Sequence, residues 1–254
     1  MSRVCAYCQK NKKLTREHIW PKCIINRMPE LELKFLDSRK LVTNSELVIS
    51  DVCSNCNNVK LSPLDSYICK LYDDYFKNYV EEKSKLSFKY DYELLIRSLL
   101  KISFNSSRTK KRINNDLAKF KDFIINGNED REDVVIKIDI ITPSIIENKK
   151  IYPKSARCGT IDIGINSENF ILRMISVNSY YFYIIISKNL ELKTELIKNE
   201  FYEIFNRVPG TIIHPYTNEI EINKFSNQDT FSAHKPHIEL NKEYYEKHRS
   251  NKKL

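Results

Sequence analysis

The sequence predicts an α+β protein with three segments: an N-terminal unit stabilised by a metal, a helical middle segment and a C-terminal α+β unit with an antiparallel sheet. Two C-x-x-C pairs lie within the first 56 residues. After them, apolar residues recur at intervals of three and four, which is the period of a helix. From Asp133 onward, runs rich in β-branched and aromatic residues are separated by turn residues, as in strands. The expected segments are 1–83, 84–129 and 130–254.

The composition predicts a globular protein with a polyanionic partner. The chain has 254 residues, of which 41% are hydrophobic, and this length is enough for a sizeable core. The net charge of +9 favours a polyanion such as nucleic acid. No run approaches the ~20 apolar residues that span a membrane, and the N-terminus lacks an apolar signal region. We therefore expect a cytoplasmic protein, in which seven cysteines favour metal binding over disulfides.

The N-terminal unit is expected to contain a short turn, an extended segment, a loop and a strand. Residues 1–13 are basic and interrupted by cysteines, which favours a tight metal-binding turn. Residues 14–21 are expected to be extended, because the proline at position 21 disfavours helical backbone at the residue before it. Residues 23–44 have a loop-like composition. The β-branched residues within 46–52 predict a strand that leads into the second cysteine pair.

Four cysteines in two pairs predict a structural zinc site: Cys5, Cys8, Cys53 and Cys56. Four thiolates complete a tetrahedral shell with no open position, so such an ion holds the chain together and does no chemistry. In zinc-finger peptides the binding is worth ~10–16 kcal/mol, enough to stabilise a region too small for its own core. The other cysteines lack this spacing and are expected to be unpaired, small and buried: Cys23, Cys69 and Cys158.

Periodicity predicts the remaining elements. Helices are expected over 56–62, 63–82, 91–104 and 109–126. Strands are expected over 134–142, 156–165, 169–177 and 180–187, with a hairpin turn at Asn178–Ser179. The last expected elements are an amphipathic helix over 189–206, strands over 212–213 and 220–225, and a helical stretch over 243–248. Nothing in 130–254 resembles a recognition helix or a nucleotide-binding loop, so a regulatory protein partner is one expectation for this unit.

Glu17 and His18 are the candidate catalytic pair. Side chains of neighbouring residues in an extended segment point to opposite faces, which allows the two groups different tasks. The carboxylate can hold a hard cation such as Mg²⁺, and the imidazole, with an ordinary pKa of ~6.5, can accept a proton at neutral pH. Asn57 directly follows the fourth cysteine, so bound zinc would fix it near the same cation. Without the flanking cysteines, a capping carboxylate and a surface histidine would explain the pair.

Three motifs together resemble the HNH endonuclease family: Cys5-x-x-Cys8, Thr15-Arg16-Glu17-His18-Ile19-x-Pro21 and Cys53-x-x-Cys56-Asn57-Asn58-x-Lys60. The resemblance covers about the first 65–70 residues and implies a ββα-metal core with a zinc ribbon. It also implies His18 as general base, Glu17 as ligand of a catalytic Mg²⁺ or Mn²⁺, and Asn57 in the place of the family's last histidine or asparagine. The stretch Leu99–Arg108 resembles a segment of stand-alone bacterial HNH proteins.

The family motif has a middle asparagine that orients the base histidine, and its position in this chain stays open. The usual spacing places it near Val48, where no asparagine stands, and the candidates are Asn44 and Asp51. Histidines beyond the motif are expected to be solvated: His214, His234, His237 and His248.

These observations predict a metal-dependent endonuclease that hydrolyses DNA phosphodiester bonds, in a restriction or anti-phage setting. The side chains expected to contact nucleic acid are Arg16, Lys60, Arg108, Lys110, Lys111 and Arg112. The last four lie at an expected helix N-terminus, where the helix dipole opposes cations, so either phosphate binding or simple solvation accounts for them. Cleavage of RNA stays open, because the site contacts phosphate. The alternative is a non-catalytic zinc-ribbon protein that binds nucleic acid or acts as an adaptor.

Overall fold

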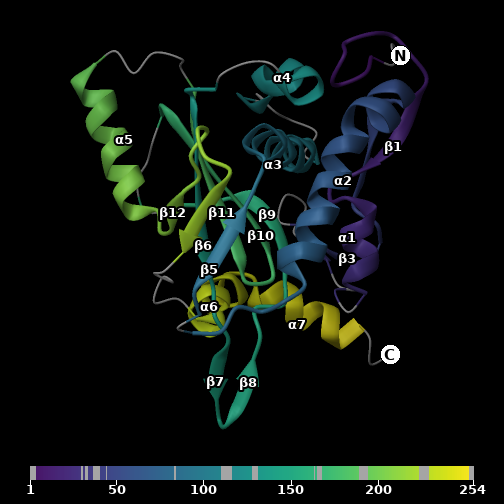
Figure 1. The fold of residues 1–254 in the computed structure, drawn as a ribbon. Helices are drawn as coiled ribbons and strands as arrows, with labels where there is room; N and C mark the ends of the chain where they lie inside the picture. The colour runs from purple at the N-terminus through teal and green to yellow at the C-terminus, as the bar shows by residue number, and fades with distance from the viewer. Residues whose placement is uncertain are drawn as a thin grey trace.

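The computed structural model of the chain is a mixed α+β fold with antiparallel sheets (Figure 1). One continuous hydrophobic core contains buried residues from each of the three expected segments, for example Val52, Leu99 and Ile184. The structure describes residues 4–29, 31, 34–36, 41–43, 45–82, 84–109, 116–127, 131–162, 164, 168–188, 194–222 and 229–251.

The N-terminal unit is a strand pair followed by a long helical stretch. β1 (Leu14–His18) pairs antiparallel with β4 (Val48–Cys53), close to the expected extended segments. The helical stretch has three parts: η2 (Cys56–Leu61), α2 (Ser62–Leu71) and η3 (Tyr72–Phe76). The two outer parts are π-helical. The sequence predicts either a break or a first-turn position at Pro63, and the structure has the second. Pro63 lies in the first turn of α2, a position where an α-helix tolerates proline.

A helix follows β1 where the composition predicts a loop. α1 (Lys22–Arg27) begins directly after Pro21 and packs against α2. Cys23 of α1 and Cys69 of α2 form a disulfide with a Cα–Cα distance of 6.1 Å, so the expectation that both are unpaired is wrong. Their spacing carries no signal, because 46 residues separate them and only the packing of the two helices brings them together. Disulfides are typical of oxidising compartments, so the cytoplasmic location stays a prediction.

The middle segment is helical, as predicted. α3 (Tyr92–Ser107) begins after Asp91, whose side chain accepts a hydrogen bond from the backbone N–H of Leu94 and caps the helix. Most of α3 after its first turn is buried, which makes it a central helix and not a surface one. η4 (Asp116–Phe120) and α4 (Lys121–Asn126) follow, and the chain leaves α4 at Gly127 with a φ of 70°.

The C-terminal unit is built around a five-stranded antiparallel sheet. Its strand order is β12 (Thr211–Ile212), β6 (Val134–Ile140), β11 (Tyr180–Ser187), β10 (Phe170–Val177) and β9 (Ala156–Thr160). The predicted turn at Asn178–Ser179 joins β10 to β11, and Asn178 adopts the positive φ of 51° that such a tight turn needs.

Both faces of this sheet are covered (Figure 1). Phe182 and Ile184 of β11 belong to the core that includes α3, whereas Tyr181 and Tyr183 pack with α5 (Glu195–Arg207) on the opposite face. Coverage on both faces explains why β11 is an uninterrupted apolar run without alternation. The same arrangement places α3 between the sheet and α2, so α3 contacts both the N-terminal unit and the sheet.

The remaining elements are short strand pairs and two C-terminal helices: β2 (Lys34–Leu36), β3 (Leu41–Thr43), β5 (Leu86–Lys89), β7 (Ser144–Ile146), β8 (Lys149–Ile151), β13 (Glu219–Ile222), α6 (Thr230–Leu240) and α7 (Lys242–Asn251). Among these, the pattern predicts only β13 and α7. α6 gave no helical signal because its sequence is polar and Pro236 lies inside it. Within the described ranges, no helix is long and apolar enough to cross a membrane.

Candidate metal centre and active site

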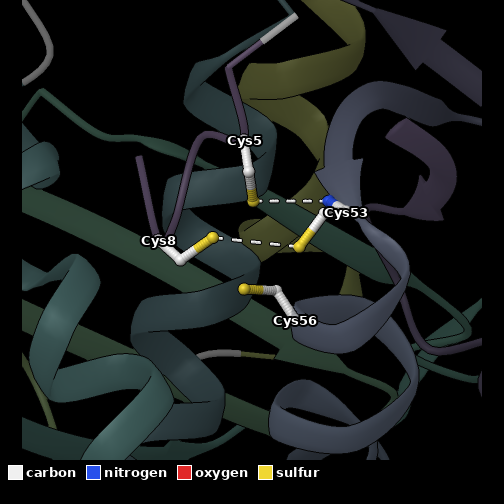
Figure 2. Close-up of side chains that lie close together, drawn as sticks. All are labelled: Cys5, Cys8, Cys53 and Cys56. Atoms are coloured by element: carbon white, nitrogen blue, oxygen red, sulfur yellow. Dashed lines mark hydrogen bonds between the residues drawn. The ribbon is translucent and has the colours of Figure 1, made fainter. Parts of the chain in front are cut away.

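Four cysteine thiols converge at the start of the N-terminal unit (Figure 2). The sulfur atoms of Cys5, Cys8, Cys53 and Cys56 all lie within 4.8 Å of one another, and those of Cys8 and Cys53 are 3.8 Å apart. A tetrahedral zinc site with zinc–sulfur distances of ~2.3 Å places its sulfurs roughly 3.8 Å apart. The cluster can therefore hold a metal ion such as zinc, in agreement with the cysteine spacing.

Backbone hydrogen bonds shape the first cysteine pair and fasten it to β4. The N–H of Gln9 donates to the Cys5 carbonyl, and Gln9 has a left-handed φ of 55° that closes the turn. The N–H of Ala6 donates to the Asp51 carbonyl at 2.8 Å. The N–H of Cys53 donates to the sulfur of Cys5 at 3.3 Å (Figure 2). The fold thus brings the thiols together, which reduces the reorganisation that metal binding requires.

The surroundings of the thiols shift their pKa values in opposite directions. Burial raises the pKa of the Cys5 thiol, but hydrogen bonds from the backbone of Cys53, Cys8 and Tyr7 outweigh burial and lower that pKa to about 7. Burial and the neighbouring cysteines raise the pKa of the Cys56 thiol well above its ordinary value. Zinc binds thiolates, so metal binding displaces protons and weakens as the pH falls.

A β-bulge interrupts the pairing of β1 with β4. Thr15 pairs with Val52, whereas Glu17 pairs with Ile49, so β4 has one extra residue opposite Arg16. Bulges bend a strand and change the direction of nearby side chains, and they are frequent beside active sites. Here the bulge directly precedes the two residues of the candidate catalytic pair.

Asn57 hydrogen-bonds the strand at this bulge. Its Nδ2 donates to the Arg16 carbonyl at 2.9 Å and to Thr15 Oγ1 at 3.0 Å. Asn57 follows the fourth cysteine of the cluster, so the position of the cluster determines the position of this amide. The structure therefore brings Asn57 beside the part of β1 that carries Glu17 and His18.

Glu17 is buried and forms an ion pair inside the protein. Its Oε1 lies 2.6 Å from Lys101 Nζ, which also lies 2.5 Å from Asp65 Oδ1. Only 4% of Glu17 and 1% of Lys101 is exposed. Charges at such depth need counter-charges, so the three groups stabilise one another. The sequence carries one signal for this cluster, because a lysine on the buried face of a helix requires an acidic partner.

The His18 ring has one nitrogen without a hydrogen bond. Its Nε2 is buried and makes no hydrogen bond with any residue that the structure describes. The nearby carboxylate oxygen, Glu46 Oε2, forms an ion-pair contact at 3.4 Å. The same carboxylate lies 3.8 Å from the Arg16 guanidinium. Motif spacing does not point to Glu46, and the only sequence signal is its place at the start of the strand expected over 46–52.

Asn105 of α3 connects this strand to the cysteine cluster. The side chain is fully buried and makes four hydrogen bonds. Its Nδ2 donates to Glu17 Oε1 and to the His18 carbonyl, both at 3.3 Å. Its Oδ1 accepts from the Tyr7 hydroxyl at 2.6 Å and from Arg108 Nη2 at 3.2 Å. Burial raises the pKa of Tyr7, which keeps this hydroxyl a donor.

The residues expected to contact nucleic acid lie in different environments. Arg16 and Lys60 are exposed on the surface. Arg108 lies inside, where its guanidinium donates to both carboxylate oxygens of Asp51 and only 10% of its side chain is exposed. Asp51, one candidate for orienting His18, is therefore bonded to α3 instead. Four predicted residues lie outside the described ranges: Asn44, Lys110, Lys111 and Arg112.

His234 is only partly exposed, in contrast to the expectation that it is solvated. Its Nε2 lies 2.9 Å from the Tyr181 hydroxyl on the outer face of the sheet. Burial and the nearby charge of Arg157 lower the pKa of His234 to about 4, so the ring is neutral at pH 7. His234 supports packing of α6, and it lies apart from the N-terminal site.

Comparison with protein families, with curated proteins and with solved structures gave no match to this chain. The resemblance to HNH endonucleases therefore rests on the sequence motifs. The mixed α+β fold and the cluster of four cysteines are observed in the structure and do not depend on this resemblance.

Removal of one clustered thiol is expected to abolish zinc binding. Cys53→Ser leaves three ligands, so the purified variant should lose most of the zinc that elemental analysis finds in the wild type. Cys158→Ser is the matched control, because Cys158 lies outside the cluster, and it should keep its zinc. Wild-type protein without bound metal, or full zinc content in Cys53→Ser, would contradict the site.

Replacement of Lys101 is expected to destabilise the protein strongly. Lys101→Met leaves the buried Glu17 carboxylate without its counter-charge, which should lower the free energy of unfolding by about 3–5 kcal/mol. Urea denaturation measures this change. Lys150→Met, which breaks an exposed ion pair with Glu81, is the control and should leave the stability nearly unchanged. Equal urea-denaturation midpoints for the two variants would show that the buried ion pair of Lys101 with Glu17 does not stabilise the fold more than an exposed pair does.

Proposed function

We propose that the chain is a metal-dependent endonuclease of the HNH type that hydrolyses phosphodiester bonds in DNA. One observation carries the proposal: the amide of Asn57 bonds the Arg16 carbonyl, directly beside Glu17 and His18. Glu17 and His18 directly follow the residue that Asn57 bonds, and Asn57 directly follows the last cysteine of the thiol cluster. Their order along the chain agrees with the motifs that resemble this family.

His18 is the general base in this proposal. Its Nε2 makes no hydrogen bond with any described residue, so the tautomer protonated on Nδ1 has a lone pair there that can accept a proton. Because Nε2 is buried beside Glu46, the half-exposed Glu46 side chain has to shift in this proposal before the attacking water reaches Nε2. Proton transfer then makes the ring a cation. The Glu46 carboxylate, 3.4 Å from Nε2 in the structure, stabilises that cation.

The donor set suits a hard cation such as Mg²⁺ or Mn²⁺. Glu17 offers a carboxylate and Asn57 a carboxamide oxygen, and both are ligands that these ions prefer. When bound, such a cation stabilises the charge that develops on the phosphate oxygens. The contacts of Glu17 with Lys101 and Asn105 both involve Oε1. A carboxylate can bind a second cation through its other oxygen, so the ion pair and the metal are compatible.

Exposed cations support a nucleic-acid substrate. Arg16 lies on the same strand as the candidate pair, Lys60 lies one helical turn beyond Asn57, and the chain carries a net charge of +9. Further phosphate contacts are proposed for Lys110, Lys111 and Arg112. The cellular setting that we propose is restriction or anti-phage defence in the cytoplasm, with a regulatory protein partner for the C-terminal unit.

A non-catalytic zinc-ribbon protein that binds nucleic acid or acts as an adaptor is the second candidate. The observation that favours it is the burial of Glu17, whose charge Lys101 balances inside the protein. A carboxylate that is balanced in this way has less need of a metal ion. The two candidates differ in whether bound nucleic acid is cut.

Substitution of His18 is expected to abolish cleavage. Wild-type protein with supercoiled plasmid and Mg²⁺ or Mn²⁺ should produce nicked or linear DNA, and His18→Ala should cut at least about 100-fold more slowly. His214→Ala is the matched control, because this histidine is exposed and lies outside the candidate site, and it should cut at the wild-type rate. Zinc content and circular dichroism should be equal in all three proteins.

The outcomes separate the candidates. Cleavage by His18→Ala at the wild-type rate would rule out His18 as the base. Salt-dependent plasmid binding without any cleavage by the wild type would favour the zinc-ribbon binding protein. Parallel reactions with labelled single-stranded RNA and with a chelator would show which nucleic acid is cut and whether the reaction needs a divalent cation.

A further inference from the structure

We propose that Asn105 of α3 is the positioning residue for His18, in the role for which the sequence candidates are Asn44 and Asp51. This inference rests on the proposed role of His18 as general base. Asn105 does not contact substrate. It acts through the backbone of His18 and the carboxylate of Glu17, and it comes from a helix outside the motif.

The hydrogen bonds of Asn105 define the orientation of its amide. Arg108 can only donate hydrogen bonds, so the atom that faces its guanidinium must be the amide oxygen. The nitrogen then faces the His18 carbonyl and Glu17 Oε1, which can only accept. A flipped amide would lose all of these bonds inside a fully buried site. The donor is therefore held toward the strand.

The strand needs a contact of this kind because its own pairing is irregular. The bulge opposite Arg16 interrupts the β1–β4 register directly before Glu17 and His18. Asn57 bonds the carbonyl on one side of this pair, and Asn105 bonds the carbonyl of the second residue. Two amides from different helices thus hold the backbone at the candidate pair, and the backbone sets where the imidazole points.

Other groups near His18 are less suited to this role. The Asp51 carboxylate is bonded to Arg108. The Glu46 side chain is 50% exposed and contacts the ring, so it can stabilise charge but is free to move. Asn105 is fully buried, and its oxygen is bonded to the Tyr7 hydroxyl between the first two cysteines of the cluster. Asn105 therefore also transmits the position of the metal-binding turn to the strand.

The test compares two variants of this network with a control on the same helix. Asn105→Asp keeps the shape and an acceptor for Tyr7 and Arg108, but it replaces the donor by a carboxylate oxygen that faces the His18 carbonyl and Glu17 Oε1 and is repelled by both. Tyr7→Phe removes only the hydroxyl that holds the amide oxygen. Ser98→Ala is the control, because Ser98 is also fully buried in α3 and donates to backbone outside this network.

Two measurements are made on each folded, zinc-containing protein. The first is kcat and KM for plasmid cleavage, with an expected loss in kcat of roughly 10- to 100-fold for Asn105→Asp at unchanged KM. The second is the NMR signal of the His18 ring in protein with labelled histidine, assigned by His18→Ala among the five histidines. This signal should shift or broaden in Asn105→Asp, change less in Tyr7→Phe and stay constant in Ser98→Ala.

The NMR arm remains decisive if the wild type cuts no nucleic acid, so failure of the proposed function is distinguishable from failure of this inference. Wild-type kcat and an unchanged His18 signal in folded Asn105→Asp would overturn the positioning role. Should Asn105→Asp fail to fold, Tyr7→Phe decides in its place, and an unchanged ring signal there would overturn the proposal. If Ser98→Ala changed the His18 signal as much as Asn105→Asp does, the effect would come from general disturbance of α3, and the positioning role of Asn105 would be overturned.

Discussion

The convergence of four thiols is the constraint on which the N-terminal unit depends. Cys5 and Cys8 lie in a turn, and Cys53 and Cys56 lie where β4 enters the helical stretch. Metal binding to such a cluster is worth ~10–16 kcal/mol in zinc-finger peptides, whereas a whole domain is stable by ~5–15 kcal/mol. One ion can therefore determine whether this unit is ordered. Because Asn57 follows the last of these cysteines, the same ion determines whether the amide reaches β1.

α3 is the second element, besides the thiol cluster, that holds the candidate catalytic pair in place. Lys101 and Asn105 lie four residues apart on one face of the helix, and Arg108 directly follows its last turn; all three side chains contact β1 or β4. A neighbouring face meets the C-terminal sheet, where Arg173 of β10 donates to Ser106 Oγ at 2.5 Å. The sheet thus holds in place the helix that holds the candidate pair. This contact gives residues after 130 a structural part in the site.

Local sequence patterns predict the features that depend on residues close together in the sequence. They do not predict contacts between segments that are far apart in the sequence. The cysteine spacing and the helical period identified the thiol cluster and α3, because each depends on residues close in sequence. The ion pair of Glu17 with Lys101 joins residues more than eighty positions apart, and no periodicity marks such a pair. The disulfide between Cys23 and Cys69 was missed for the same reason. Asn105 lies in the stretch Leu99–Arg108 that resembles a segment of stand-alone bacterial HNH proteins, but no pattern assigns it a role, which follows only from its contacts with β1.

The location of a divalent cation tests the central claim most directly. Mn²⁺ is paramagnetic and broadens the NMR signals of nearby nuclei, so its position can be read in the zinc-loaded protein. We expect substoichiometric Mn²⁺ to broaden the side-chain amide of Asn57 and the ring of His18, while backbone amides of α5, beyond the central sheet, stay sharp. Equal broadening of all these signals, or selective broadening away from β1, would show that the carboxylate, imidazole and carboxamide do not form a metal site.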